Sequence, residues 1–126
     1  MNIVFFNYDK QITNEFELII NPIQYGLHEV LWEDGGYSDF SDRYVILEEN
    51  ADFSTLSDEE FLQQYKEQAI MELAKLIERN RVFFLANGTL QEKETEFVND
   101  KTLINSFTTE EELDLNLQQI LPKYKL

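Results

Sequence analysis

Apolar and polar residues near the start of the chain follow a pattern that predicts two strands. Asn2 to Tyr8 is rich in Ile, Val and Phe, and Glu15 to Ile20 resumes an apolar pattern. Between them stand Asp9, Lys10 and Asn14, which favour turns. The two runs therefore predict a β-hairpin.

Residues 22–33 allow two interpretations. Asn21 before Pro22 is typical of a helix N-terminus, and apolar residues at helical spacing follow. Against a helix, Gly26 would cost about 1 kcal/mol in its interior. Alternate residues from His28 to Trp32 would instead share one face of a strand. We favour a short helix that ends near Gly35 and keep the strand as the alternative.

The next segments predict a loop, a strand and a long helix. Tyr37 to Asp42 is polar and loop-like, whereas Tyr44 to Leu47 is an apolar run suited to a buried strand. Ser57 and Glu60 then form a capping box that starts a helix at Asp58 and carries it to about Asn80. The apolar stripe of this helix consists of Leu62, Tyr65, Ala69, Leu73, Leu76 and Ile77.

After the long helix the pattern favours strands again. Val82 to Leu85 is an unbroken apolar run, and Asn87-Gly88 is the sequence of a type I′ turn, so a hairpin should return through Leu90 to Val98. A further strand is expected at Thr102 to Phe107. Thr108 or Thr109 then caps a last helix, which Pro122 ends.

These elements predict an α+β fold. It consists of a hairpin and a three-strand meander in an antiparallel sheet, packed against one long helix, with a C-terminal helix and the short early helix. A chain of 126 residues without a Pro/Gly/Ser-rich joint fits a single domain, residues 1–126. There is no cysteine, signal peptide or apolar run of membrane-spanning length, so we expect a cytoplasmic protein without membrane contact.

Candidate catalytic chemistry is sparse. His28 is the only histidine, and beside Val30 it is expected to be a half-buried packing residue. The four glycines do not form a phosphate-binding loop. With 25 acids, pairs of carboxylates have no specificity as a glycosidase signal. We therefore expect a protein that is not an enzyme, with no catalytic residue and no cofactor.

Two further patterns suggest a metal site and a nuclease, but the spacing of the residues opposes the first and the net charge opposes the second. Asp34, Asp39 and Asp42 could hold calcium, but the EF-hand pattern is missing, so no metal site is expected. Gln91-Glu92-Lys93 resembles the catalytic strand of restriction-type nucleases. A net charge of −15 repels a polyanion, so we expect no direct binding of nucleic acid.

The acidity is concentrated in one part of the chain. Six acids lie in first helical turns, where they favour the helix dipole, and the other 19 still outnumber the 10 bases. Residues 11–65 hold 13 acids and a single base, Arg43. Aromatic residues are interleaved with these acids, which is typical of a protein interface. The alternative is that the acids only keep the protein soluble while the aromatics pack inside.

We therefore predict a partner-binding surface within this acidic segment. Its residues are Glu29, Trp32, Glu33, Asp34, Tyr37, Asp39, Phe40, Asp42, Glu48, Glu49 and Asp52. The expected partner is a basic protein such as a nuclease, inhibited in the manner of immunity proteins, antitoxins and phage counter-defence proteins. The alternatives are an acidic accessory or structural module that forms a homodimer, and a carboxylate- or metal-dependent enzyme.

Overall fold

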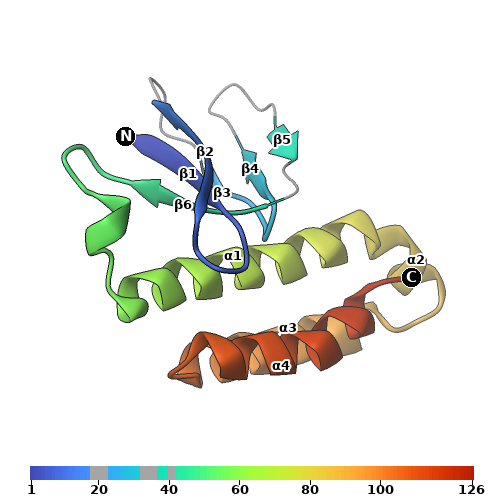
Figure 1. Ribbon diagram of the computed structural model, residues 1–126. Coiled ribbons are helices and arrows are strands. Elements are labelled where there is room, and N and C mark those ends of the chain that lie inside the picture. The colour runs from blue at the N-terminus through green and yellow to red at the C-terminus, as the bar shows by residue number, and fades with distance from the viewer. Residues whose placement is uncertain (18–22, 32–36, 40–41) are drawn as a thin grey trace.

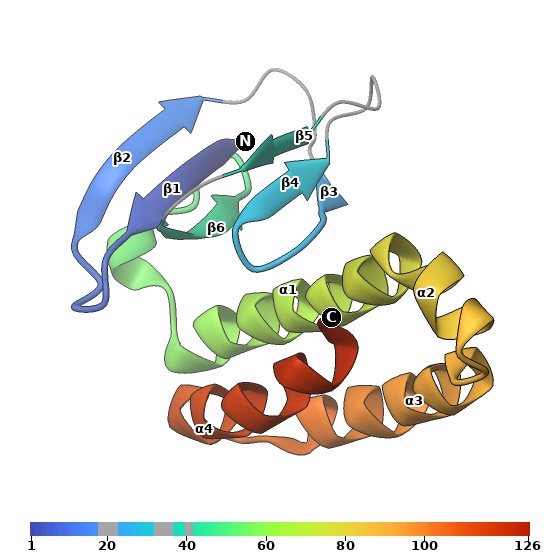
Figure 2. The same ribbon diagram turned by 90° about the vertical axis from the view of Figure 1, so that its right-hand side faces the viewer.

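The computed structural model describes residues 1–17, 23–31, 37–39 and 42–126, with the backbone alone at 37–39. The strands are β1 (Asn2–Phe6), β2 (Ile12–Glu17), β3 (Ile23–Gln24), β4 (Glu29–Leu31), β5 (Tyr37–Asp39) and β6 (Arg43–Leu47). The helices are α1 (Asp58–Arg79), α2 (Arg81–Ala86), α3 (Leu90–Ser106) and α4 (Glu110–Ile120), with 3-10 turns at Phe53–Thr55 and Leu121–Tyr124. Helix α1 lies between the strands and the pair α3 and α4 (Figures 1 and 2). The predicted α+β class is confirmed.

Two small antiparallel sheets make up the N-terminal half. The first has the order β2-β1-β6, and the second has the order β3-β4-β5. Pairing of β1 with β2 confirms the predicted hairpin, but β2 starts at Ile12, so Asn14 lies in the strand and not in the predicted turn, and residues 18–20 of the predicted strand lie outside the described residues. The strand β6 confirms the predicted buried strand. The prediction of a loop at Tyr37 to Asp42 is wrong for 37–39, which form β5, and residues 40 and 41 lie outside the described residues.

The two faces of β1 pack against different layers. Ile3 and Phe5 join Tyr44 and Val30 in one apolar cluster, so this face meets the second sheet. Val4 lies on the other face of β1 and joins a cluster with Phe61 at the start of α1. The alternation of β1 thus directs one face of its sheet to the second sheet and the other face to the start of α1.

The favoured short helix at residues 22–33 is wrong, because the described part of this segment forms the strands β3 and β4. Their hairpin is held by Tyr44, whose hydroxyl lies 3.0 Å from the Gly26 carbonyl oxygen and 2.7 Å from that of Glu29. A Cβ on Gly26 would lie 2.3 Å from Glu72 Oε2 of α1. Gly26 therefore marks a close approach to α1 that local helical spacing does not reveal.

Helix α1 begins where the sequence predicts. The Ser57 side chain accepts the Glu60 N–H, and the Glu60 carboxylate accepts the Ser57 N–H, which completes the capping box. The buried face of α1 packs on α3 and α4 through Leu73, Ile104 and Leu113, all 0% exposed. This contact forms the main core of the molecule.

The predicted meander after α1 is wrong, because residues 81–106 form the helices α2 and α3. Gly88 has φ 78°, but Asn87 has φ −92°, so the pair is not a type I′ turn. The Thr89 N–H donates to the Phe84 carbonyl and the Gly88 N–H to that of Leu85. This is the Schellman arrangement at a helix C-terminus, which uses a glycine for the same conformational reason as a hairpin does.

The spacing of buried residues explains the helix at 90–106. Phe97, Asp100 and Ile104 face the interior, whereas Val98 is 62% exposed. These intervals of three and four residues are helical, and Gln, Glu and Lys at 91–94 are good helix formers. Thr109 then caps α4 by accepting the Glu112 N–H, as predicted, and the helix ends just before Pro122.

Candidate partner-binding surface

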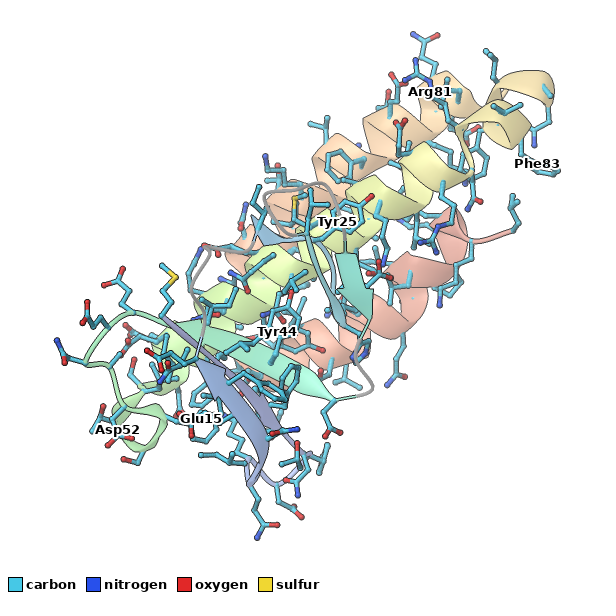
Figure 3. All side chains as sticks on the ribbon, turned by 90° about the horizontal axis from the view of Figure 1, so that it is seen from above. Glu15, Tyr25, Tyr44, Asp52, Arg81 and Phe83 are labelled. Carbon is cyan, nitrogen blue, oxygen red and sulfur yellow. The ribbon has the colours of Figure 1, made fainter. Side chains whose placement is uncertain are left out.

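Exposed carboxylates gather where β1 starts and β6 ends. We call this surface the acidic sheet end and define it by Glu15, Glu17, Glu48, Glu49 and Asp52. The pairing of Asn2 with both Glu17 and Leu47 brings the end of β2 and the chain that follows β6 to opposite sides of β1. Figure 3 shows Glu15 and Asp52 at the same end of the molecule.

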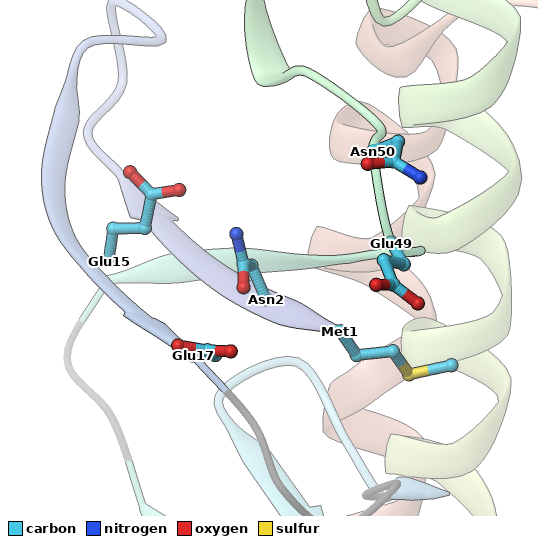
Figure 4. A pocket seen from close by; sticks show the side chains of 6 residues that line it. All are labelled: Met1, Asn2, Glu15, Glu17, Glu49 and Asn50. Carbon is cyan, nitrogen blue, oxygen red and sulfur yellow. The ribbon is translucent and has the colours of Figure 1, made fainter.

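A shallow hollow lies within the acidic sheet end. It has a volume of about 670 Å³ and is lined by Met1, Asn2, Glu15, Glu17, Glu49 and Asn50. Figure 4 shows the three carboxylates and two amides around it, from β1, β2 and the turn after β6. Carboxylate and amide oxygens accept hydrogen bonds, so the hollow suits donor-rich cationic groups such as those of Arg and Lys.

The carboxylates of the acidic sheet end have no ion-pair partner among the described residues. Within the described part of the chain, five lysines and arginines pair with carboxylates elsewhere, at Lys10, Arg43, Lys75, Lys93 and Lys123. The segments outside the described residues contain neither lysine nor arginine. Negative charge at this end is therefore left for a partner or for solvent.

The structure separates the predicted site residues into groups. Glu48, Glu49 and Asp52 lie together and exposed, whereas Asp42 stands at the other end of β6 and accepts a hydrogen bond of 2.7 Å from the Thr13 hydroxyl. Tyr37 and Asp39 belong to β5, which is described by its backbone alone. The predicted residues Trp32, Glu33, Asp34 and Phe40 lie outside the described residues.

Glu29 is a correction to the predicted surface, because its side chain is inside the protein. Its Oε1 lies 2.5 Å from Lys75 Nζ, and Glu72 Oε2 lies 2.6 Å from the same nitrogen. Burial by itself lowers the pKa of Lys75, but hydrogen bonds to Glu29 and Glu72 and their charges raise that pKa above its ordinary value. Glu29 therefore joins the second sheet to α1 and is not available to a partner.

A second hollow, between the strands and α4, contains the one histidine. His28 is exposed, which corrects the predicted half-buried position, and its Nδ1 lies 3.3 Å from the Asp42 carbonyl oxygen. Arg43 lies 3.2 Å from Glu110 Oε1 and stacks 3.7 Å above the Tyr65 ring. These contacts join β6 to α1 and α4, so we assign the charged groups of this hollow a structural role.

Glu15 and Glu17 are site residues that the sequence prediction omitted. Both lie on β2, where a spacing of two residues places their side chains on one face. An acid repeated at that interval within a predicted strand is the signal that could have included them. Their inclusion shifts the candidate surface toward the edge of the sheet.

The opposite end of the molecule has a different character. Val82, Phe83 and Leu85 of α2 are 80%, 54% and 65% exposed. Arg79 and Arg81 are also exposed there, and neither forms an ion pair within the described structure. Figure 3 shows Arg81 and Phe83 far from Glu15 and Asp52. Arginine side chains without an ion pair in the described structure thus lie far from the acidic sheet end.

In the described part of the chain, no group of three or more histidine and acidic side chains is placed to hold a metal ion. No helix in the same residues is long and apolar enough to cross a membrane. In comparisons with known proteins, no family model, curated protein or solved structure matches this chain.

Proposed function

We propose that this protein is a non-catalytic binding protein that covers a basic surface of a partner protein with its acidic sheet end. The class of partner we propose is a nuclease or another protein that handles nucleic acid, held in an inhibited state. A basic groove that binds phosphates attracts a compact acidic surface for the same electrostatic reason.

One observation carries this proposal. Three of the five carboxylates at the acidic sheet end, those of Glu15, Glu17 and Glu49, line one hollow, and none of the five has a cationic partner among the residues described. Like charges placed together repel one another, so their concentration on one surface costs stability rather than supplying it. Such an arrangement is explained when a partner brings the missing positive charge.

The proposal predicts that charge at one end of the molecule determines capture of a basic protein. The variant Glu17→Gln, Glu48→Gln and Glu49→Gln neutralises three exposed carboxylates of the acidic sheet end. We expect it to lose most of the capture that the unaltered protein shows at low salt. Each lost close charge pair contributes roughly 1 kcal/mol or more at an interface, which is several-fold in affinity. Affinity capture with identification of the bound protein measures this.

A matched control separates local contact from total charge. Glu78→Gln, Glu92→Gln and Glu94→Gln also neutralise three exposed carboxylates, but at the end of the molecule that carries α2. This variant should capture the partner as the unaltered protein does. Equal loss in both variants, or recovery of no basic protein at all, would contradict the proposed function.

A homodimeric accessory module is the second candidate, and the exposed apolar residues of α2 favour it. Val82, Phe83 and Leu85 could bury one another's surface between two copies. The capture experiment distinguishes the candidates, because a homodimer retains a second copy of this chain and its capture does not depend on the acidic sheet end.

A further inference from the structure

The two outer edges of the first sheet, at β6 and at β2, differ in how their main-chain groups are hydrogen-bonded. At the β6 edge, the Ile46 N–H donates to Gln64 Oε1 over 2.9 Å, and Gln64 Nε2 donates to the Ile46 carbonyl over 2.8 Å. Gln68 Nε2 donates to the Tyr44 carbonyl over 2.9 Å. Two glutamine amides of α1 thus occupy the positions of a neighbouring strand, and this edge is closed.

The hydrogen bonds at β6 indicate which main-chain groups point outward from β2. Main-chain groups of successive residues point to opposite sides of a strand. The main-chain N–H and C=O groups of Ile46 point away from β1. Those of its neighbour Val45 therefore point toward β1, where Val45 pairs with Val4. The main-chain groups of Val4 therefore point to β6, and those of its neighbours Ile3 and Phe5 point to β2.

On β2 the same alternation places Glu15 and Glu17 on the outer edge. Ile3 pairs with Phe16, and Phe5 pairs with Asn14. The main-chain groups of Glu15 and Glu17, which alternate with these paired residues, therefore point away from β1. Consistent with this, the Glu15 N–H donates to the side chain of its own neighbour, Asn14 Oδ1, over 2.9 Å. Within the described chain, no other strand pairs with β2.

Every residue of β2 is exposed, so both faces of the edge are accessible. Phe16 is 51% exposed and lies on the face opposite to that of Glu15 and Glu17. The carboxylates of Glu15 and Glu17 line the hollow of the acidic sheet end. An added strand would therefore meet negative charge on one face and an aromatic side chain on the other.

We propose that the β2 edge binds an extended segment of the basic partner as an added antiparallel strand. This inference rests on the proposed function and specifies its mode of binding. Main-chain hydrogen bonds to Glu15 and Glu17 supply the pairing, and the residues opposite them are lysine or arginine. The residue of the partner that lies opposite Phe16 is apolar.

The charge of β2 argues against a second copy of this chain at the same edge. Antiparallel pairing of two β2 strands brings Glu15 and Glu17 of one copy close to those of the other. Like charges on neighbouring strands destabilise a sheet. A basic segment removes this repulsion, so we assign the edge to a partner of opposite charge.

The test uses three synthetic peptides that alternate lysine and valine over seven residues and differ only in N-methylation. In antiparallel addition, the residues opposite Glu15 and Glu17 direct their own N–H groups toward β2. N-methylation of the lysines removes these donors, whereas N-methylation of the valines removes donors on the far side. The binding of each peptide to ¹⁵N-labelled protein is followed by NMR at low salt.

We expect the unmethylated and valine-methylated peptides to bind and to shift the amide signals of β2. The lysine-methylated peptide should bind at least about tenfold more weakly, because two or three main-chain hydrogen bonds are lost. Equal binding of the two methylated peptides would overturn strand addition but leave the acidic surface of the proposed function intact. Shifts confined to other elements, or no binding by any peptide, would also overturn it.

A variant of the protein gives a second test in the opposite direction. Asn14→Ala removes the acceptor that competes for the Glu15 N–H, so we expect the unmethylated peptide to bind about threefold more tightly. Weaker binding by this variant would contradict the assignment of Glu15 to the outer edge. Signals of β2 that change with protein concentration in the absence of peptide would show a second copy at the edge and overturn the proposal.

Discussion

Replacement of Lys75 by methionine is expected to lower the free energy of unfolding by about 3–5 kcal/mol, because it leaves two carboxylates without their cation. The Lys75 side chain is 4% exposed and lies within 2.6 Å of both Glu29 and Glu72. Methionine is similar in length, so lost volume is a small part of the effect. Urea denaturation followed by circular dichroism measures this change.

The origin of this loss is tested by neutralising the two carboxylates that are left without a cation. Adding Glu29→Gln and Glu72→Gln to Lys75→Met should restore part of the stability, because neutral amides cost less to bury than carboxylates. The matched control, Lys101→Met, removes an exposed lysine of α3 and should change the free energy of unfolding by less than about 0.5 kcal/mol. A loss at Lys75 as small as that of the control would show that the network is not buried.

Truncation of Ile104 to alanine is expected to cost about 2–5 kcal/mol. Ile104 is 0% exposed and belongs to the cluster in which α3 packs on α1 and α4. The substitution removes buried methyl groups and leaves a cavity that well-packed helices fill only in part. The same denaturation experiment measures the loss.

Val98 provides the control for this prediction, because it lies on the same helix and is 62% exposed. Val98→Ala should change the free energy of unfolding by less than about 0.5 kcal/mol. Comparable losses at both positions would contradict the helical arrangement of residues 90–106.

The elements that the sequence predicts well are those with a local cause. The capping box at Ser57 and Glu60 lies within four residues and starts α1 where expected. The β1 and β2 hairpin likewise follows from the apolar run of β1 and the turn residues Asp9 and Lys10 after it, although β2 starts at Ile12, three residues before the predicted strand. Nothing distant in the chain competes with these signals.

The elements that the sequence predicts wrongly depend on context. Asn87-Gly88 suits either a hairpin turn or a helix C-terminus, because both need positive φ at the glycine. The role of Gly26 depends on Glu72 and Lys75, which are distant in the sequence. Local spacing therefore favoured a meander in one segment and a helix in the other.

The candidate surface was predictable in part. Charge counting located Glu48, Glu49 and Asp52, which lie together and exposed. It could not exclude Glu29, because only tertiary contact with Lys75 buries that carboxylate. It also does not identify β2 as the open edge, since Gln64 and Gln68 close the other edge from α1.

The proposal that the acidic sheet end binds a basic partner is tested most directly by the kinetics of association with the captured protein. The association rate of the unaltered protein should fall at least about tenfold as ionic strength rises from roughly 0.05 to 0.5 M. The variant with glutamine at Glu17, Glu48 and Glu49 should associate more slowly at low salt and depend less on ionic strength. The variant with glutamine at Glu78, Glu92 and Glu94 should behave as the unaltered protein does. Identical association rates and salt dependence for all three proteins would contradict the proposal.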